Sequence, residues 1–145
     1  MEPSLGDRAA NALATLLNRQ TRVGLYRSVT AGLGDLGVTP ATYTVISGIA
    51  RHGPISAAGL APLAGVERSV ASRYAARLAE GGLVVRTPDP ADGRSTLLSL
   101  TVDGDRVIAL MRERLGEELD RRLSDWPDGL AESFVDGFER FVDER

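Results

Sequence analysis

One stretch of the chain, residues 39–101, constrains the fold most strongly, because signals for the start and end of helices follow one another there at short intervals. Thr39-Pro40 predicts a helix start, since threonine caps helix N-termini and proline is favoured in the first turn. Gly53-Pro54 predicts the end of that helix. Two further helices are expected close behind it, over about residues 57–64 and 67–81.

The short middle helix has clear boundaries. Ser56 is a favourable N-cap, and Gly65 followed by Val66 predicts a tight turn at the other end. Pro62 lies inside this helix, so we expect an irregular backbone near it, because proline lacks a main-chain donor. Two helices joined by a tight glycine turn form a helix-turn-helix.

A β-hairpin is expected directly after the third helix. Residues 83–86 and 96–101 are rich in Leu, Val and Thr, which is typical of strands. Residues 89–93, Asp-Pro-Ala-Asp-Gly, have the composition of a turn. The expected fold class is therefore mainly α with a small β-hairpin wing, a winged helix-turn-helix flanked by long helices.

The third helix has two faces of different character. At about 100° per residue, Val70, Tyr74, Leu78 and two alanines share one arc and predict a buried side. The opposite arc is small and polar and includes Ser69, Ser72, Arg73 and Arg77. Short side chains let a helix approach the bases of a major groove, and arginine can contact guanine through two hydrogen bonds. The competing interpretation is an ordinary solvent-exposed face without a binding role. The hairpin that directly follows the helix argues against it.

Charge is distributed unevenly along the chain. All 17 basic residues are arginine, which is typical of a GC-rich genome and also suits phosphate recognition. Residues 51–94 carry six arginines against four acids, whereas residues 102–145 carry seven against thirteen. The net charge of −3 therefore combines a mildly basic centre with an acidic C-terminal part.

Missing residue types exclude several classes of site. The chain has no cysteine and one histidine, His52, which excludes thiolate zinc sites, cysteine nucleophiles and multi-histidine metal centres. We find no glycine-rich phosphate loop and no paired-carboxylate motif. We therefore expect no catalytic residues, no metal, no cofactor and no enzyme activity. No membrane-length apolar stretch and no signal-peptide pattern is present, so we expect a cytoplasmic protein without membrane attachment.

The hairpin carries the most specific motif. Residues 86–101, Arg-Thr-Pro-Asp-Pro-Ala-Asp-Gly-Arg-Ser-Thr-Leu-Leu-Ser-Leu-Thr, resemble the wing of the multiple-antibiotic-resistance regulator (MarR) family, whose pattern is roughly Asp-x-x-Asp-x-Arg followed by Leu-x-Leu-Thr. The preceding helix and Gly82-Leu83-Val84 are also similar to that family. Gly59, where the family often has Glu, and Pro62 depart from its pattern. The resemblance covers almost the whole chain. It implies a homodimeric bacterial transcription regulator that binds double-stranded DNA and is often released by a small aromatic or phenolic ligand.

The resemblance also implies roles for individual residues. Those that would face the major groove are Ser69, Ser72, Arg73 and Arg77. Arg94 would enter the minor groove. Asp92 would support the wing by pairing with a nearby arginine, for which Arg86 is the candidate. The alternative for Asp92 is an ordinary Asp-Gly turn residue.

We expect a single domain over residues 1–145, in which residues 39–101 form the DNA-binding lobe. Dimerisation helices are expected in residues 1–36 and 102–145. Apolar spacing predicts one long helix from Asp7 to about Leu33. A second long helix is expected from about Val102 to Ser124, with a shorter one after it.

The last helix carries all three phenylalanines of the chain, Phe134, Phe138 and Phe141, at helical spacing. Soluble monomers avoid exposing such a stripe, so we interpret it as the interface of a two-fold homodimer rather than as a cofactor site. A two-fold dimer presents two recognition helices to successive major grooves, which predicts a pseudo-palindromic operator.

An effector site is expected in the crevice between the dimer helices and the lobe, where the resemblance places it. The candidate residues are Arg22, Tyr26, Tyr43 and His52. The alternative for the two tyrosines is ordinary core or interface packing. For His52 it is capping of a helix C-terminus, where a cation is favourable.

The function we expect is that of a homodimeric, DNA-binding transcriptional repressor released by a small-molecule effector. The alternative is a winged-helix protein-interaction module without DNA binding. Arg73, Arg77 and Arg94 discriminate between the two, because an interaction module need not retain them.

Overall fold

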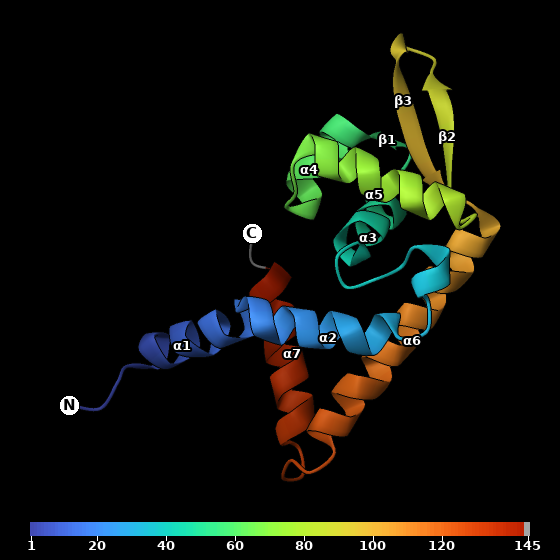
Figure 1. Cartoon of the computed structure of the whole chain (residues 1–145). Coiled ribbons are helices and arrows are strands. Elements are labelled where there is room, and N and C mark those ends of the chain that lie inside the picture. Colours follow the sequence, from blue (N-terminus) through green and yellow to red (C-terminus); the bar gives the residue numbers. More distant parts are fainter. Residues whose placement is uncertain (144–145) are drawn as a thin grey trace.

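The structure, a computed structural model, describes residues 1–143 and consists of helices around one small antiparallel sheet (Figure 1). Its elements in chain order are α1 (Leu5–Leu17), α2 (Arg19–Thr30), the 3-10 helix η1 (Gly34–Leu36), α3 (Tyr43–His52), β1 (Ile55–Ser56), α4 (Ala57–Ala64), α5 (Arg68–Glu80), β2 (Val84–Asp89), β3 (Asp92–Leu100), α6 (Val102–Leu123) and α7 (Leu130–Asp143). The mainly α winged helix-turn-helix expected from the sequence is confirmed. Within residues 1–143, no helix combines the length and the apolar character needed to cross a membrane.

Helices α3, α4 and α5 and the sheet form a lobe around one core, from which the β2–β3 hairpin projects (Figure 1). Its largest fully buried side chains include Ile46, Ile49, Leu60, Leu78 and Leu83. Helix α6 closes this core from below with Val107 and Met111, which are also buried. The inner face of α5 and the base of the wing are therefore fixed by the same core.

The sheet has three strands in the order β1-β3-β2, one strand more than the predicted hairpin. Strand β1 pairs antiparallel with β3, and Ile55 lies opposite Leu98. A strand of two residues has no detectable alternation of polar and apolar residues, so the sequence pattern could not predict it. It connects the start of α4 to the base of the wing.

The hairpin is longer than predicted and its turn is shorter. Strand β2 continues to Asp89 and β3 begins at Asp92, so only Pro90 and Ala91 remain between the strands. The Asp89 carboxylate accepts a hydrogen bond from the Ala91 backbone N–H at 2.9 Å. The outer part of both strands is mostly exposed, which is why it lacks the apolar alternation on which the predicted boundaries depended.

The prediction of one helix from Asp7 to Leu33 is wrong, because two helices meet at Asn18. The Asn18 backbone leaves the helical region, with φ −56° and ψ 138°. Its side-chain oxygen accepts a hydrogen bond from the Gln20 backbone N–H at 2.7 Å and so caps α2. Helix α1 starts with a capping box: the Ser4 hydroxyl accepts a hydrogen bond from the Asp7 backbone N–H, and the hydroxyl and backbone N–H of Ser4 both donate to the Asp7 carboxylate. These bonds hold the pKa of the Asp7 carboxyl below its usual value.

Helix α3 starts three residues later than Thr39-Pro40 suggested. Those residues belong to a turn in which the Thr39 carbonyl accepts a hydrogen bond from the Tyr43 N–H at 3.0 Å. Thr42 is fully buried; its hydroxyl donates to the Gly37 carbonyl at 2.7 Å and accepts from the Thr39 N–H at 2.9 Å. This internal hydrogen bonding makes the turn before α3 part of the core.

Helix α4 has the predicted boundaries but not the predicted irregularity. The Ser56 hydroxyl caps it by accepting from the Gly59 N–H at 3.1 Å. The helix is continuous through Pro62, although proline lacks a main-chain donor. Gly65 ends it in the left-handed conformation, with φ 69° and ψ 33°, which glycine adopts without steric cost.

Arg114 of α6 links that helix to the end of α2. Its Nη1 donates hydrogen bonds to the carbonyl oxygens of Val29, at 3.0 Å, and Ala31, at 2.7 Å. Carbonyls at a helix C-terminus have no partner within the helix, so the guanidinium satisfies groups that would otherwise need water.

We expect Arg114→Met to lower the free energy of unfolding by about 1.5–3 kcal/mol, the usual contribution of hydrogen bonds to a charged group. Arg112→Met, two residues away on the exposed surface of α6, is the matched control and should change it by less than about 0.5 kcal/mol. Urea unfolding at one fixed protein concentration measures both values. Equal effects of the two substitutions would contradict this role for Arg114.

Helices α1 and α7 contain no buried residue. On α7, Phe134, Phe138 and Phe141 are 47%, 49% and 69% exposed. The Phe134 and Phe138 rings stack with centroids 5.9 Å apart, and Trp126 meets Phe134 edge-on at 5.2 Å. Leu13, Leu16 and Leu17 of α1 are also exposed. Both helices therefore present apolar faces that nothing in residues 1–143 covers.

Candidate nucleic-acid interface

Helix α5 has the two faces that its sequence predicts. Ala71, Ala75 and Leu78 are buried in the lobe, and Val70 and Tyr74 are partly buried. The residues of the opposite face, all exposed, are Ser69, Ser72, Arg73 and Arg77. The core fixes the helix from one side, so its polar face is presented to the outside as a rigid surface.

Tyr74 lies between the two arginines of this face and contacts both. The Arg73 guanidinium carbon is 5.5 Å from the centre of the Tyr74 ring, and that of Arg77 is 5.4 Å from it. Cations at this distance from an aromatic face are attracted by its quadrupole. Helical spacing alone places Tyr74 on the buried arc, and the signal for these contacts is the pair of arginines one residue before and three residues after it. The ring therefore restricts where both guanidinium groups lie.

We expect Tyr74→Leu to weaken specific DNA binding by about 1–2 kcal/mol per protomer, since two exposed cation–π contacts are each worth about 0.5–1 kcal/mol. Leucine keeps the apolar contact with the lobe, so the midpoint of thermal unfolding should fall little. Tyr74→Phe retains the ring and is the matched control. Fluorescence anisotropy titrations with operator DNA measure the effect, and equal affinities of the Leu and Phe variants would exclude this role for the ring.

Arg94 is exposed and lies near the outer end of the wing, two residues into β3. Its backbone N–H donates a hydrogen bond to the Asp92 carboxylate at 3.0 Å. In residues 1–143, Asp92 takes part in none of the ion pairs, so its contact with an arginine is to the main chain rather than to a guanidinium. The structure thus favours the turn-residue interpretation of Asp92. Arg86, the expected partner, lies on β2 beside α5.

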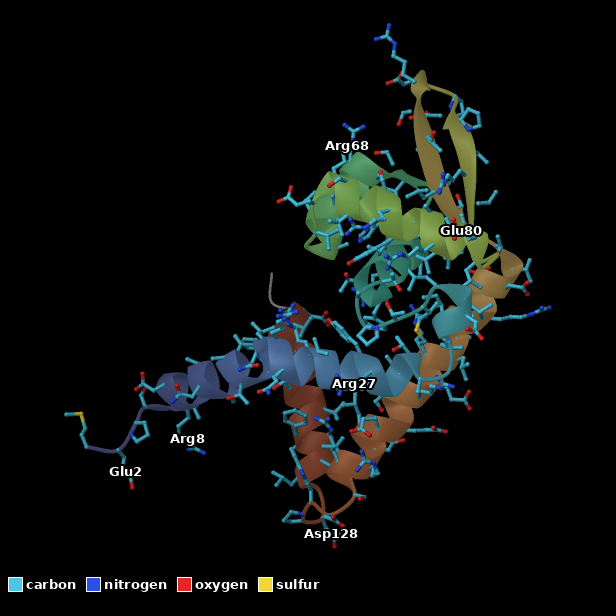
Figure 2. The ribbon with its side chains drawn as sticks, in the orientation of Figure 1. Glu2, Arg8, Arg27, Arg68, Glu80 and Asp128 are labelled. Atoms are coloured by element: carbon cyan, nitrogen blue, oxygen red, sulfur yellow. The ribbon has the colours of Figure 1, made fainter. Side chains whose placement is uncertain are left out.

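The candidate surface and the turn between α6 and α7 lie at opposite ends of the molecule. Figure 2 shows Arg68, at the start of α5, pointing away from the body on the side toward which the wing projects. Asp128, between α6 and α7, lies at the other end. On α6, ion pairs with Arg121 and Arg122 hold the pKa of the Glu118 carboxyl below its usual value. The acidic turn at Asp128 is therefore remote from the polar face of α5.

The crevice residues predicted for an effector do not all meet. Tyr26 of α2 and Tyr43 of α3 are both partly buried, and their rings stack at 4.3 Å. A hollow of about 210 Å³ between α3 and α6 is lined by Tyr43, Ser47, Ala50, Arg51, Ile108, Met111, Arg112 and Leu115. Arg22 and His52 are exposed and are not part of that lining. The structure thus brings Tyr43 together with Arg51 and Arg112, which the sequence analysis missed.

Comparison with known proteins places this geometry in a family. The family model described as "MarR family" matches residues 36–95, which include α3, α4, α5, β2 and the first residues of β3. The transcriptional regulator FarR of Neisseria gonorrhoeae is 30% identical over 120 residues, which cover 83% of this chain and 77% of FarR. The chain belongs to the MarR family.

Other relatives agree with the MarR assignment. The multiple antibiotic resistance protein MarR of Salmonella typhimurium is 29% identical over 92 residues, 63% of this chain and 64% of that protein. The crystal structure of RV1404 from Mycobacterium tuberculosis is 27% identical, covers 99% of this chain and 96% of that one, and has a TM-score of 0.72. The chain covers only 55% of the length of another relative, a regulatory protein described for the hcr operon of Thauera aromatica. As a member of the MarR family, the protein is similar to transcriptional regulators.

The two departures from the MarR pattern leave the helix-turn-helix intact. The Gly59 N–H donates the hydrogen bond by which the Ser56 hydroxyl caps α4, and Pro62 lies within the continuous helix. Leu60 between them is fully buried in the lobe core. Helix α4 therefore packs beneath α5 in spite of both residues.

Proposed function

We propose that the protein is a homodimeric, DNA-binding transcriptional repressor that acts in the cytoplasm and is released from DNA by a small-molecule effector. In this proposal residues 39–101 are the DNA-binding lobe, and residues 1–36 and 102–145 provide the dimerisation helices. Helix α5 enters the major groove and the wing enters the adjacent minor groove. The dimer represses by occupying its operator.

One observation carries the proposal: the polar face of α5 is exposed beside a wing that projects on the same side (Figure 1). Ser69 and Ser72 are short enough for close approach, while Arg73 and Arg77 can form two hydrogen bonds with a guanine. Arg94, near the end of the wing, suits the narrow and strongly negative minor groove of A·T-rich DNA. A surface serving only protein contacts has no need of three exposed arginines in this arrangement.

The uncovered apolar faces of α1 and α7 support the dimer. Phe134, Phe138 and Phe141 form a continuous stripe, and monomeric proteins rarely expose one of this size. A second copy related by a two-fold axis covers the stripe with the same stripe of its own α7. The two copies of α5 then face successive major grooves about 10 base pairs apart, which requires a pseudo-palindromic operator.

The salt dependence of DNA binding tests the proposed function against the alternative of a protein-interaction module. A gel-shift titration on sheared genomic DNA should show binding that weakens steeply as salt rises, because phosphate contacts release counterions. A triple variant with Arg73, Arg77 and Arg94 replaced by alanine is the matched control and should bind far more weakly. Failure of the wild-type protein to bind any DNA at low salt would favour the interaction module.

An aromatic or phenolic effector is proposed for the crevice that contains Tyr43. The ligand acts by preferring a dimer whose recognition helices are wrongly spaced for DNA. We expect operator DNA to weaken ligand binding by the same factor by which the ligand weakens DNA binding, because linkage is reciprocal. Calorimetric titration of a releasing ligand into free and DNA-bound protein measures this factor. A ligand that releases the protein at equilibrium but binds both forms equally would contradict the mechanism.

A further inference from the structure

A hollow of about 190 Å³ lies in the angle between α5 and the wing. It is lined by Ala57, Ser72, Ala75, Arg86, Thr96 and Leu98. The hollow is open to solvent at the same surface as the polar face of α5, because Ser72, Arg86 and Thr96 are all exposed. It therefore belongs to the surface that faces DNA in the proposed complex.

The polar groups of this hollow all suit an anion. The sheet register places Arg86 opposite Leu98 and Pro88 opposite Thr96, so Arg86 and Thr96 project from the same face of the sheet. Across from them, α5 contributes the Ser72 hydroxyl. None of the six lining residues is acidic. In residues 1–143, the Arg86 guanidinium takes part in none of the ion pairs, so its charge is not neutralised by a carboxylate.

The shape of a DNA duplex indicates what lies between a recognition helix and a wing. A major groove and the minor groove next to it are separated by one sugar–phosphate strand. If α5 occupies the first groove and the wing the second, that strand must cross the angle between them. The hollow lies in this angle, and its lining includes one cationic side chain, Arg86, and two hydroxyl groups, those of Ser72 and Thr96.

We propose that this hollow seats a phosphodiester group of the operator strand that runs between α5 and the wing, with Arg86 as its ionic partner and Ser72 and Thr96 as hydroxyl donors. This inference rests on the proposed function, and it reassigns Arg86 from support of the wing to DNA contact. Phosphate contacts fix the position and register of a protein on the duplex. The seat therefore sets how deeply α5 and the wing enter their grooves.

Removing the charge of Arg86 should have a characteristic effect on binding. The probe is a duplex selected by the wild-type protein from a random 30-base-pair library. Loss of one phosphate contact per protomer lowers the slope of log affinity against log salt by about 0.9 per protomer, and affinity at 0.15 M salt by about 5-fold per protomer. Arg86→Gln should show this loss equally on the selected and on a scrambled duplex. Arg86→Lys keeps the charge and should retain the wild-type slope.

A scan with single methylphosphonates tests the position of the seat. Each modified duplex lacks the charge of one phosphate. The affinity of the wild-type protein should fall about 5-fold when the modified phosphate is the one between the two contacted grooves of a half-site. The affinity of Arg86→Gln should not fall further at that phosphate, because its contact is already lost. Arg94→Ala is the matched control and should stay sensitive at that position. Thr96→Val should weaken binding without changing the slope, since it removes a neutral donor.

Three results would overturn the inference. These are an unchanged slope for Arg86→Gln, an identical methylphosphonate profile for wild type and Arg86→Gln, or a loss explained by a lower unfolding midpoint of the variant. In each case the selected duplex still binds the wild-type protein, so the proposed function stands. If the wild-type protein selects no duplex at all, the proposed function fails and the phosphate seat fails with it.

Discussion

Phe138→Asp is expected to convert the dimer into monomers and to weaken operator binding by about 10²–10⁴-fold. The central position of Phe138 in the exposed stripe of α7 makes a buried charge there costly for the interface. Once the protomers separate, each half-site is bound independently and the gain from linked binding is lost. Sedimentation velocity should show a fall from about twice 15.4 kDa to the monomer mass. Titration with operator DNA measures the loss of affinity.

Two controls make this result specific to the stripe. Ser133→Asp adds the same charge to the same helix outside the Phe134–Phe138–Phe141 line and should leave the dimer intact. The unfolding of the lobe should be little changed in Phe138→Asp, because no residue of α7 is buried in it. A monomeric wild-type protein, or a dimeric Phe138→Asp variant with wild-type affinity, would exclude α7 as the interface.

Arg94→Ala and Arg73→Ala are expected to weaken DNA binding in different ways. Arg94, near the end of the wing, contributes charge in a groove that distinguishes bases poorly. Arg94→Ala should therefore weaken binding to operator and to scrambled DNA by similar factors. It should also reduce the slope of log affinity against log salt by roughly one per protomer. Arg73→Ala should instead lower the ratio of specific to non-specific affinity, by about 1–3 kcal/mol per half-site.

These two effects are separated by titrating each variant with operator and with scrambled duplex at several salt concentrations. Ser133→Asp, far from the α5 surface, serves as the reference for unaltered binding. Should Arg94→Ala bind both duplexes as tightly as the wild type, the end of the wing would have no part in DNA binding. Should Arg73→Ala leave the specificity ratio unchanged, α5 would not be the element that recognises the sequence.

The lobe could be predicted from the sequence because its elements are bounded by strong local signals. Gly53 caps the end of α3, and Ser56 and Gly65 cap the two ends of α4, so these boundaries followed from single residues. The faces of α5 were also predictable. Its apolar residues recur at helical spacing, so they lie on one side of the helix, and that side packs against the lobe.

Other features depend on contacts that are distant in the sequence. Strand β1 exists because the chain passes Leu98 of β3, and two residues cannot show a strand pattern. The break at Asn18 lies within an otherwise continuous helical pattern, and a polar side chain decides it by capping α2. The stacking of Tyr26 on Tyr43 similarly joins two helices whose relative position no local signal determines.

The sequence predicted which residues make up the candidate site but not which of them contact one another. The sequence indicated which residues of α5 and the wing are exposed. It did not indicate that Tyr74 lies against Arg73 and Arg77, because its apolar ring was counted as core. The Asp92 carboxylate accepts a hydrogen bond from the Arg94 main chain, which the composition of the turn did not indicate, and its pairing with an arginine side chain stays a prediction.

Hydroxyl-radical footprinting of the selected operator tests the central claim most directly, because it records which sugars along each strand the protein shields. We expect two equivalent protected regions related by a two-fold axis, with centres about 10 base pairs apart and with minor-groove protection beside each one. The protection beside each region should disappear in Arg94→Ala, while the two central regions remain. A single protected region without two-fold symmetry, from one chain per duplex, would contradict a dimer that binds through α5 and the wing.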